Sequence, residues 1–174
     1  MRELKRFYSV LVVAVLFISC DKTTDFYTIQ GEAQGSTYSI KYIASEEKVT
    51  KNQIDSLLTA FDLSLSTYRP DSKISKINAG DSTVVVDEFF TETFQLSNQI
   101  YKETNGLFDP TIGVLVNAYG FGPNKKQENL SQKQIDSLLQ FVGFDKIALN
   151  PNKTISKKHQ ETFIDFNAIA QGYS

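Results

Sequence analysis

The sequence has 174 residues, 41% hydrophobic and 22% charged, a composition typical of one globular domain or part of one; it excludes collagen-like, coiled-coil and wholly disordered chains. Its 18 basic and 20 acidic residues give a formal charge of −2, without the basic excess of a nucleic-acid binder, so we expect no nucleic-acid partner. One Cys and one His are too few for a disulfide framework or a Cys/His zinc site, which leaves carboxylates, hydroxyls, amides, backbone groups or a hard metal for any chemistry.

The N-terminus is typical of a bacterial signal peptide. Basic residues precede an apolar run over residues 7–18. As a helix this run would rise about 18 Å, short of a hydrocarbon core of about 30 Å. It ends just before Cys20 and resembles a lipobox, although Phe17 stands where Leu is usual. We predict a signal peptide over residues 1–19, lipidation of Cys20 and a tether over residues 20–26; an ordinary signal peptide with an incidental Cys is the alternative.

Apolar periodicity and turn residues predict the remaining elements. Helices are expected behind N-caps, at Thr50 and Ser131 with capping boxes, and at Asp87 and Asn167. Short strands are expected at residues 27–30, 37–43, 84–86, 147–149, 154–156 and 163–166. Because strands and helices do not alternate regularly, we expect an incomplete α+β domain with short, mostly antiparallel strands and packed helices.

Two segments in the first half of the chain combine groups that suit a nucleotide. The glycines of Gly31–Gly35 permit close backbone approach to a phosphate, although a plain hairpin loop explains them as well. Tyr68 could stack on a flat ring and Arg69 could pair with a phosphate. The alternative is a capped helix end with a solvated Arg69.

Two further segments lie in the second half. Asp109 precedes a proline, and its carboxylate could accept from a ribose or adenine group or merely form an Asx turn. The stretch Asp165–Gly172 puts helix-start amides, which suit a phosphate, beside carbonyls that suit Mg²⁺. The single histidine, His159, stands in a polar stretch and is expected at the solvated surface.

No one of these segments is specific, but their order and spacing resemble the ApbE family, the FAD:protein FMN transferases also labelled thiamine biosynthesis lipoproteins. The resemblance rests on four motifs: GxxxGSTY at 31–38, LSTYRPDSxISxIN at 65–78, GxFDPTIGxLVNxYGFG at 106–122 and IDFNAIAQGY at 164–173. It covers nearly all of residues 28–174 but only about the first half of the family's length. Residues 27–174 are therefore expected to be the N-terminal part of a flavin transferase domain that continues past Ser174.

The resemblance implies a Mg²⁺-dependent enzyme that cleaves FAD, attaches FMN to a Thr or Ser of an exported target protein and releases AMP. The target would belong to a membrane redox complex, and the enzyme would be lipid-anchored in the bacterial cell envelope. By position in the motifs, the residues that would bind FAD are Gln34, Tyr68, Arg69, Pro70, Leu107 and Gln171. Ala168 would offer its carbonyl to the metal, and Asp109 would shape the site. Catalytic residues are expected beyond Ser174, so residues 20–174 alone are expected to be inactive.

The sequence departs from the family pattern at three places. Lys73 stands where Glu is frequent, Phe166-Asn167 replaces Leu-Gly, and Gln171 replaces a common Lys, which removes a positive charge near the cofactor. Two alternatives stay open: a lipid-anchored flavin-binding or FAD-hydrolysing protein, and a non-enzymatic lipoprotein that binds a partner through an acidic surface.

Overall fold

The computed structural model describes residues 24–123 and 129–174. The predicted signal peptide and Cys20 lie outside these ranges. The elements in chain order are β1 (Asp25–Ala33), β2 (Ser36–Ala44), α2 (Lys51–Leu65), α3 (Lys73–Asn78), α4 (Glu88–Glu103), α5 (Gly113–Ala118), α6 (Gln132–Leu139), the 3₁₀ helix η1 (Phe144–Lys146), β3 (Ile147–Leu149), β4 (Ile155–Lys157) and α7 (Asn167–Tyr173). No helix within the described ranges has the length and apolarity needed to cross a membrane. The expected α+β class is confirmed.

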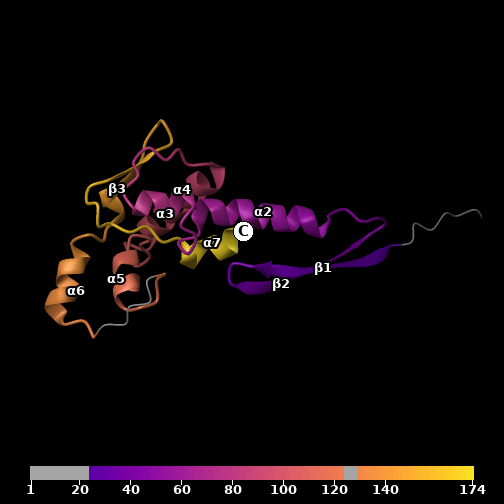
Figure 1. Cartoon of the computed structure of the whole chain (residues 1–174), viewed down its shortest axis with the longest axis horizontal. Coiled ribbons are helices and arrows are strands. Elements are labelled where there is room, and N and C mark those ends of the chain that lie inside the picture. Colours follow the sequence, from indigo (N-terminus) through magenta and orange to yellow (C-terminus); the bar gives the residue numbers. More distant parts are fainter. Residues whose placement is uncertain (1–23, 124–128) are drawn as a thin grey trace, which may run out of the picture.

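A long hairpin and the helix that follows it form an arm on one side of the molecule (Figure 1). β1 and β2 pair antiparallel in a register that runs from Asp25↔Ala44 to Ala33↔Ser36. Gln34 and Gly35 make the turn with φ angles of 54° and 73°. A two-residue turn with both φ angles positive matches the right-handed twist of the paired strands. The predicted strands are therefore confirmed, and both are longer than expected.

Helix α2 begins at a complete capping box. The Thr50 side chain accepts from the backbone N–H of Gln53, while the Gln53 side chain accepts from the N–H of Thr50. This reciprocal pairing satisfies amides that an isolated helix start leaves without partners. Further along, Phe61 and Leu65 are buried and fix the end of α2 to the body of the molecule.

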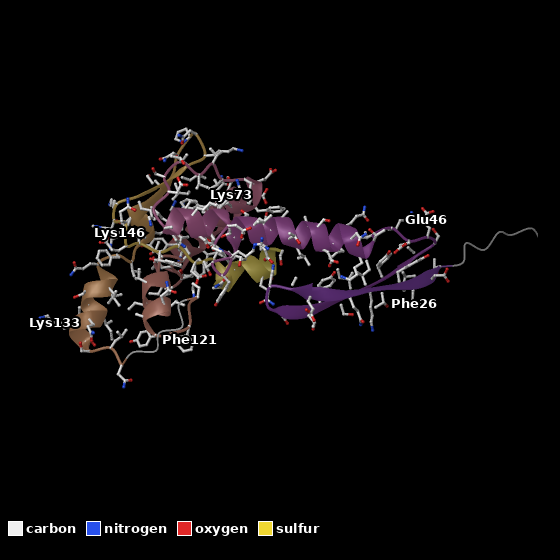
Figure 2. The ribbon with its side chains drawn as sticks, viewed as in Figure 1. Phe26, Glu46, Lys73, Phe121, Lys133 and Lys146 are labelled. Carbon is white, nitrogen blue, oxygen red and sulfur yellow. The ribbon has the colours of Figure 1, made fainter. Side chains whose placement is uncertain are left out.

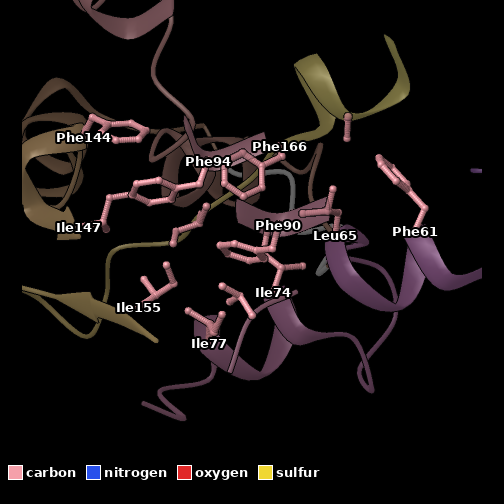
Figure 3. Close-up of a cluster of buried hydrophobic side chains, with 13 residues drawn as sticks. Phe61, Leu65, Ile74, Ile77, Phe90, Phe94, Phe144, Ile147, Ile155 and Phe166 are labelled. Carbon is pink, nitrogen blue, oxygen red and sulfur yellow. The ribbon is translucent and has the colours of Figure 1, made fainter. Parts of the chain in front are cut away.

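The core gathers apolar side chains from segments far apart in the sequence (Figure 3). Phe90 on α4 meets Phe166 edge to face, with ring centroids 5.4 Å apart, and neither ring is exposed. Phe94 of α4 packs on Phe144 with centroids 5.0 Å apart. Because α4 contributes to both contacts, it links Phe144 and Phe166 in one core.

Three sequence predictions need correction. Residues 84–86 form no strand; this segment is irregular, and the Val86 N–H donates to the carbonyl of Lys153. Residues 163–166 form only one isolated parallel bridge, from Phe163 to Ile112. Asn167 does not cap α7, because Phe166 holds the cap position and the Asp165 carboxylate accepts from the N–H of Asn167.

The short helices α3 and α5 were not predicted, since six residues are too few for apolar periodicity to identify.

Candidate functional site

A cleft of about 530 Å³ opens where the hairpin turn, the end of α2 and α7 approach one another. Gln34 and Gly35 line it from the turn, and Gln171 lines it from α7. Helix α2 contributes Phe61, Asp62 and Leu65 as an apolar wall with one carboxylate. Two residues expected to bind FAD, Gln34 and Gln171, thus lie around one hollow although more than a hundred residues separate them in the sequence.

A second cleft of about 460 Å³ adjoins the first and shares Tyr68 and Asn167 with it. Its walls come from the loop after α4, from α5 and from the segment that enters α7. The residues that line it besides the shared pair are Leu107, Phe108, Asp109, Pro110, Ile112, Val116, Phe121, Asp165 and Ala168. The two adjoining clefts, together called the groove below, bring together Gln34, Tyr68, Leu107, Asp109, Ala168 and Gln171 from four separate motifs.

Exposed apolar side chains stand at the mouth of the second cleft. Leu107 is 93% exposed and Phe121 75%, and the latter projects from the body beside α5 (Figure 2). Tyr68 is 57% exposed, and its hydroxyl donates to the carbonyl of Phe121 at 3.3 Å. Large apolar side chains left in water at a groove are typical of a surface that a ligand or partner covers.

Arg69 and Pro70 line neither of these clefts. The Arg69 guanidinium is bound through Nε and Nη2 to the Asp71 carboxylate, at 3.1 and 2.8 Å. This contact raises the pKa of Arg69 and lowers that of Asp71. In this structure Arg69 is thus paired with Asp71 just beyond the end of α2.

Asp109 forms the Asx turn that its position before a proline predicts. Its Oδ1 accepts from both the N–H and the hydroxyl of Thr111, at 2.8 and 2.6 Å. The fully buried Thr111 hydroxyl in turn accepts from the N–H of Gly143 at 2.7 Å. The network ties the wall of the second cleft to the chain after α6.

Two carboxylates in the groove are partly withdrawn from water. Burial raises the pKa of Asp62, and the positive charge of Arg69 opposes that rise. Burial also raises the pKa of Asp165, against the stabilising hydrogen bond from the N–H of Asn167. The Asp165 N–H donates to the carbonyl of Pro110 at 2.8 Å, and this hydrogen bond joins two of the segments that line the second cleft. A bound cation would stabilise such poorly solvated carboxylates.

Oxygen-bearing groups line the second cleft. Asp109, Asp165 and Ala168 line the same cleft, which fits the oxygen ligands that Mg²⁺ prefers. In residues 24–123 and 129–174, no three His, Cys, Asp or Glu side chains gather closely enough to hold a metal by themselves. A magnesium ion here would therefore take further ligands from a phosphate, from water or from another part of the protein.

Sequence reasoning missed several residues of the groove. Asn167 lines both clefts, yet it was interpreted as a helix cap. Phe121 and Asp62 also line the groove without having been predicted. Phe121 lies in the most specific of the four motifs, which is the signal that could have identified it. His159 is exposed at the surface, as expected, with its ring edge-on to Phe141.

Known proteins are similar to this chain in sequence. The ApbE family model matches residues 34–174. The FAD:protein FMN transferase of Haemophilus influenzae is 31% identical over 94% of this chain and 51% of its own length. That of Vibrio cholerae is 30% identical over the same shares. The chain spans about half the length of the curated relatives it matches.

Solved structures agree in fold. The flavin transferase ApbE from Vibrio cholerae superposes with a TM-score of 0.77 at 27% identity, over 87% of this chain and 51% of that one. The apo form of the flavinyl transferase ApbE from Pseudomonas stutzeri gives a TM-score of 0.77 at 28% identity, over 86% and 50%. The family match covers residues 34–174, and each structural match covers more than four fifths of the chain. The chain belongs to the ApbE family.

Proposed function

We propose that the full-length protein is a Mg²⁺-dependent transferase that moves FMN from FAD to a Thr or Ser of an exported acceptor protein and releases AMP. The observation that carries this proposal is the pair of adjoining clefts, which gathers six of the eight residues expected to contact FAD or the metal. The names of the relatives support the same reaction, because they are FAD:protein FMN transferases.

Each wall of the groove has a distinct task in the proposal. The Tyr68 ring, with Leu107 and Phe121 beside it, offers an apolar surface on which a flat flavin or adenine ring can stack. Gln34 and Gln171 both line the first cleft, and their side-chain amides supply donors and acceptors without charge. Gln171 supplies no positive charge to the phosphates, so a metal and further donors must provide it.

Magnesium would bind at the Ala168 end of the groove, with Asp165 and Asp109 as neighbouring oxygens. When bound, it would offset the negative charge that develops as the pyrophosphate is cleaved. The chain itself keeps this end of the groove in shape, through the Asp109–Thr111–Gly143 hydrogen bonds and the Asp165–Pro110 backbone bond. In this proposal the catalytic groups belong to the part of the relatives' length that the chain does not span.

The location of the protein is also a proposal. Acyl groups on Cys20 hold it to the envelope membrane, and it acts outside the cytoplasmic membrane on an acceptor from a membrane redox complex. The support is the sequence pattern over residues 1–20. Mass spectrometry of the detergent-extracted protein tests it, because cleavage before Cys20 and added acyl mass must appear together.

The function is tested with the full-length protein, FAD, Mg²⁺ and solubilised envelope proteins from a strain that lacks the gene. Covalent flavin on a protein band, FMN mass on a Thr or Ser peptide and equimolar AMP are expected, and a chelator should abolish all three. FAD consumed or held without a labelled protein would support the flavin-binding or FAD-hydrolysing alternative. Absence of FAD binding would support the partner-binding alternative.

A further inference from the structure

The hairpin turn that lines the first cleft is weakly supported. Ile29 is the hairpin's one buried apolar residue among those described, and it lies in mid-strand. Between the turn end and α2 there is a hollow of about 430 Å³, lined in part by Gly31, Ala33 and Thr59. Apart from Leu58, the residues that line this hollow are small, polar or charged, so apolar contact between the turn end and α2 is sparse.

One polar contact crosses this hollow. The Tyr38 hydroxyl donates to Oδ1 of Asp55 at 2.5 Å, while Lys51 donates to Oδ2 of the same carboxylate at 2.5 Å. Lys51 also stands over the Tyr38 ring, 5.8 Å from its centroid. Within the described residues the Tyr38–Asp55 contact is the one side-chain hydrogen bond between the hairpin and α2. Each oxygen of the Asp55 carboxylate accepts one hydrogen bond, from Tyr38 or from Lys51.

The contact is placed to act on the turn. Tyr38 lies on β2 shortly after the Gln34–Gly35 turn, and its register partner on β1 is Gly31. On α2, Asp55 lies about 10 Å along the helix axis from Asp62, which lines both the hollow and the first cleft. A change at Tyr38 or Asp55 is therefore passed to Gln34 through a few residues of paired strand.

We propose that Tyr38 and Asp55 form a latch that positions the Gln34–Gly35 turn over the first cleft. Neither residue lines that cleft, so both are positioning residues rather than ligand contacts. The consequence for flavin binding rests on the proposed function, whereas the consequence for the turn does not. Without the latch, the turn samples positions away from α7, and FAD binding must first restore the closed arrangement.

The same strand offers a matched control. Tyr42 lies on the same face of β2, and its hydroxyl serves the loop before α2, where it meets the carbonyl of Val49 at 3.2 Å and the N–H of Lys48 at 3.1 Å. This contact holds the opposite end of the hairpin, near Glu46 in Figure 2. Tyr38→Phe and Tyr42→Phe remove the same atom from the same strand at opposite ends.

The experiment uses the full-length protein and two readouts. Hydrogen exchange of the amides at residues 33–38 should quicken in Tyr38→Phe and in Asp55→Asn, and stay near the unmodified rate in Tyr42→Phe. The Kd for FAD should rise roughly three- to tenfold in the first two variants, since a hydrogen bond to a charged group is lost, and turnover at saturating FAD should be unchanged.

The two proposals fail in different ways. If the unmodified protein does not bind FAD, the proposed function is overturned, while exchange at residues 33–38 still decides the latch. If Tyr38→Phe matches Tyr42→Phe in both exchange and Kd, the latch is overturned and the function stands. Loss of turnover at saturating FAD in Tyr38→Phe would also overturn a purely positioning role.

Discussion

The Tyr38 ring lies directly across Gly31, its partner in the hairpin register. A Cβ built on Gly31 would lie 2.6 Å from the ring carbons and the hydroxyl of Tyr38. No real Cβ tolerates that approach, so a side chain at position 31 must displace the ring. The first glycine of the GxxxGSTY motif therefore leaves room for the Tyr38 ring on its way to Asp55.

Gly31→Ala should displace the Tyr38 ring from Asp55. We expect a loss of about 1 kcal/mol in the free energy of unfolding, because the displaced Tyr38 hydroxyl loses its hydrogen bond to Asp55. Denaturant titration measures it. In a Tyr38→Ala background the same change should cost much less, since the obstructing ring is gone. Equal costs in both backgrounds would contradict this account.

Phe166 holds the segment that enters the groove to the core. Its ring is fully buried against Phe90, so Phe166→Ala should cost about 3–5 kcal/mol in the free energy of unfolding. Phe121→Ala removes an equal side chain that is 75% exposed, and should change stability by less than about 0.5 kcal/mol. A similar loss in the two variants would be inconsistent with this packing.

Thr111→Val should separate a hydrogen-bond role from a packing role. The buried hydroxyl accepts from the Gly143 N–H and donates to Asp109. Its removal leaves the Gly143 amide without this partner and should lower the free energy of unfolding by about 1–3 kcal/mol. Thr111→Ser keeps the hydroxyl and loses one methyl group, worth about 0.8 kcal/mol. In chemical denaturation the Thr111→Val variant should be less stable than the Thr111→Ser variant. The reverse order would mean that the methyl group contributes more to stability than the hydroxyl.

Leu107→Ala distinguishes binding from folding. Because the side chain is 93% exposed, stability should change by less than about 0.5 kcal/mol. If FAD covers this side chain, the Kd should rise about tenfold in the full-length protein, since burial of a leucine side chain is worth about 1.5–3 kcal/mol. Calorimetric titration measures the Kd, and an unchanged value would remove Leu107 from the site.

Asp165 should make stability depend on pH. Burial raises its pKa in the folded state above the unfolded value, so folding carries a cost above that pKa that disappears as pH falls through it. Asp165→Asn should therefore raise the thermal midpoint at pH 7, and the difference from the unmodified protein should shrink as the solution is acidified. A lower midpoint at pH 7 would show that the hydrogen bond from Asn167 outweighs desolvation.

Local signals in the sequence determined much of the arrangement. The Thr50 and Ser131 capping boxes, the alternating strands before and after Gly35, and the Asx turn at Asp109 each depend on residues a few positions apart. The four motifs, taken in order, also identified the family and most of the residues around the groove. Interactions of this range can be recognised in sequence because the responsible residues are neighbours.

Other features were decided only by tertiary structure. Val84–Val86 has the composition of a strand but finds one backbone partner at Lys153 instead of a ladder. Arg69 could serve a phosphate by its chemistry, but in this structure it pairs with Asp71 and does not line either cleft. The pairing of Tyr38 with Asp55 and the joint placement of Gln34 and Gln171 depend on how α2 packs against the hairpin and α7. Such contacts join residues distant in sequence, and their free energy comes from the packing of whole elements, which no local pattern records.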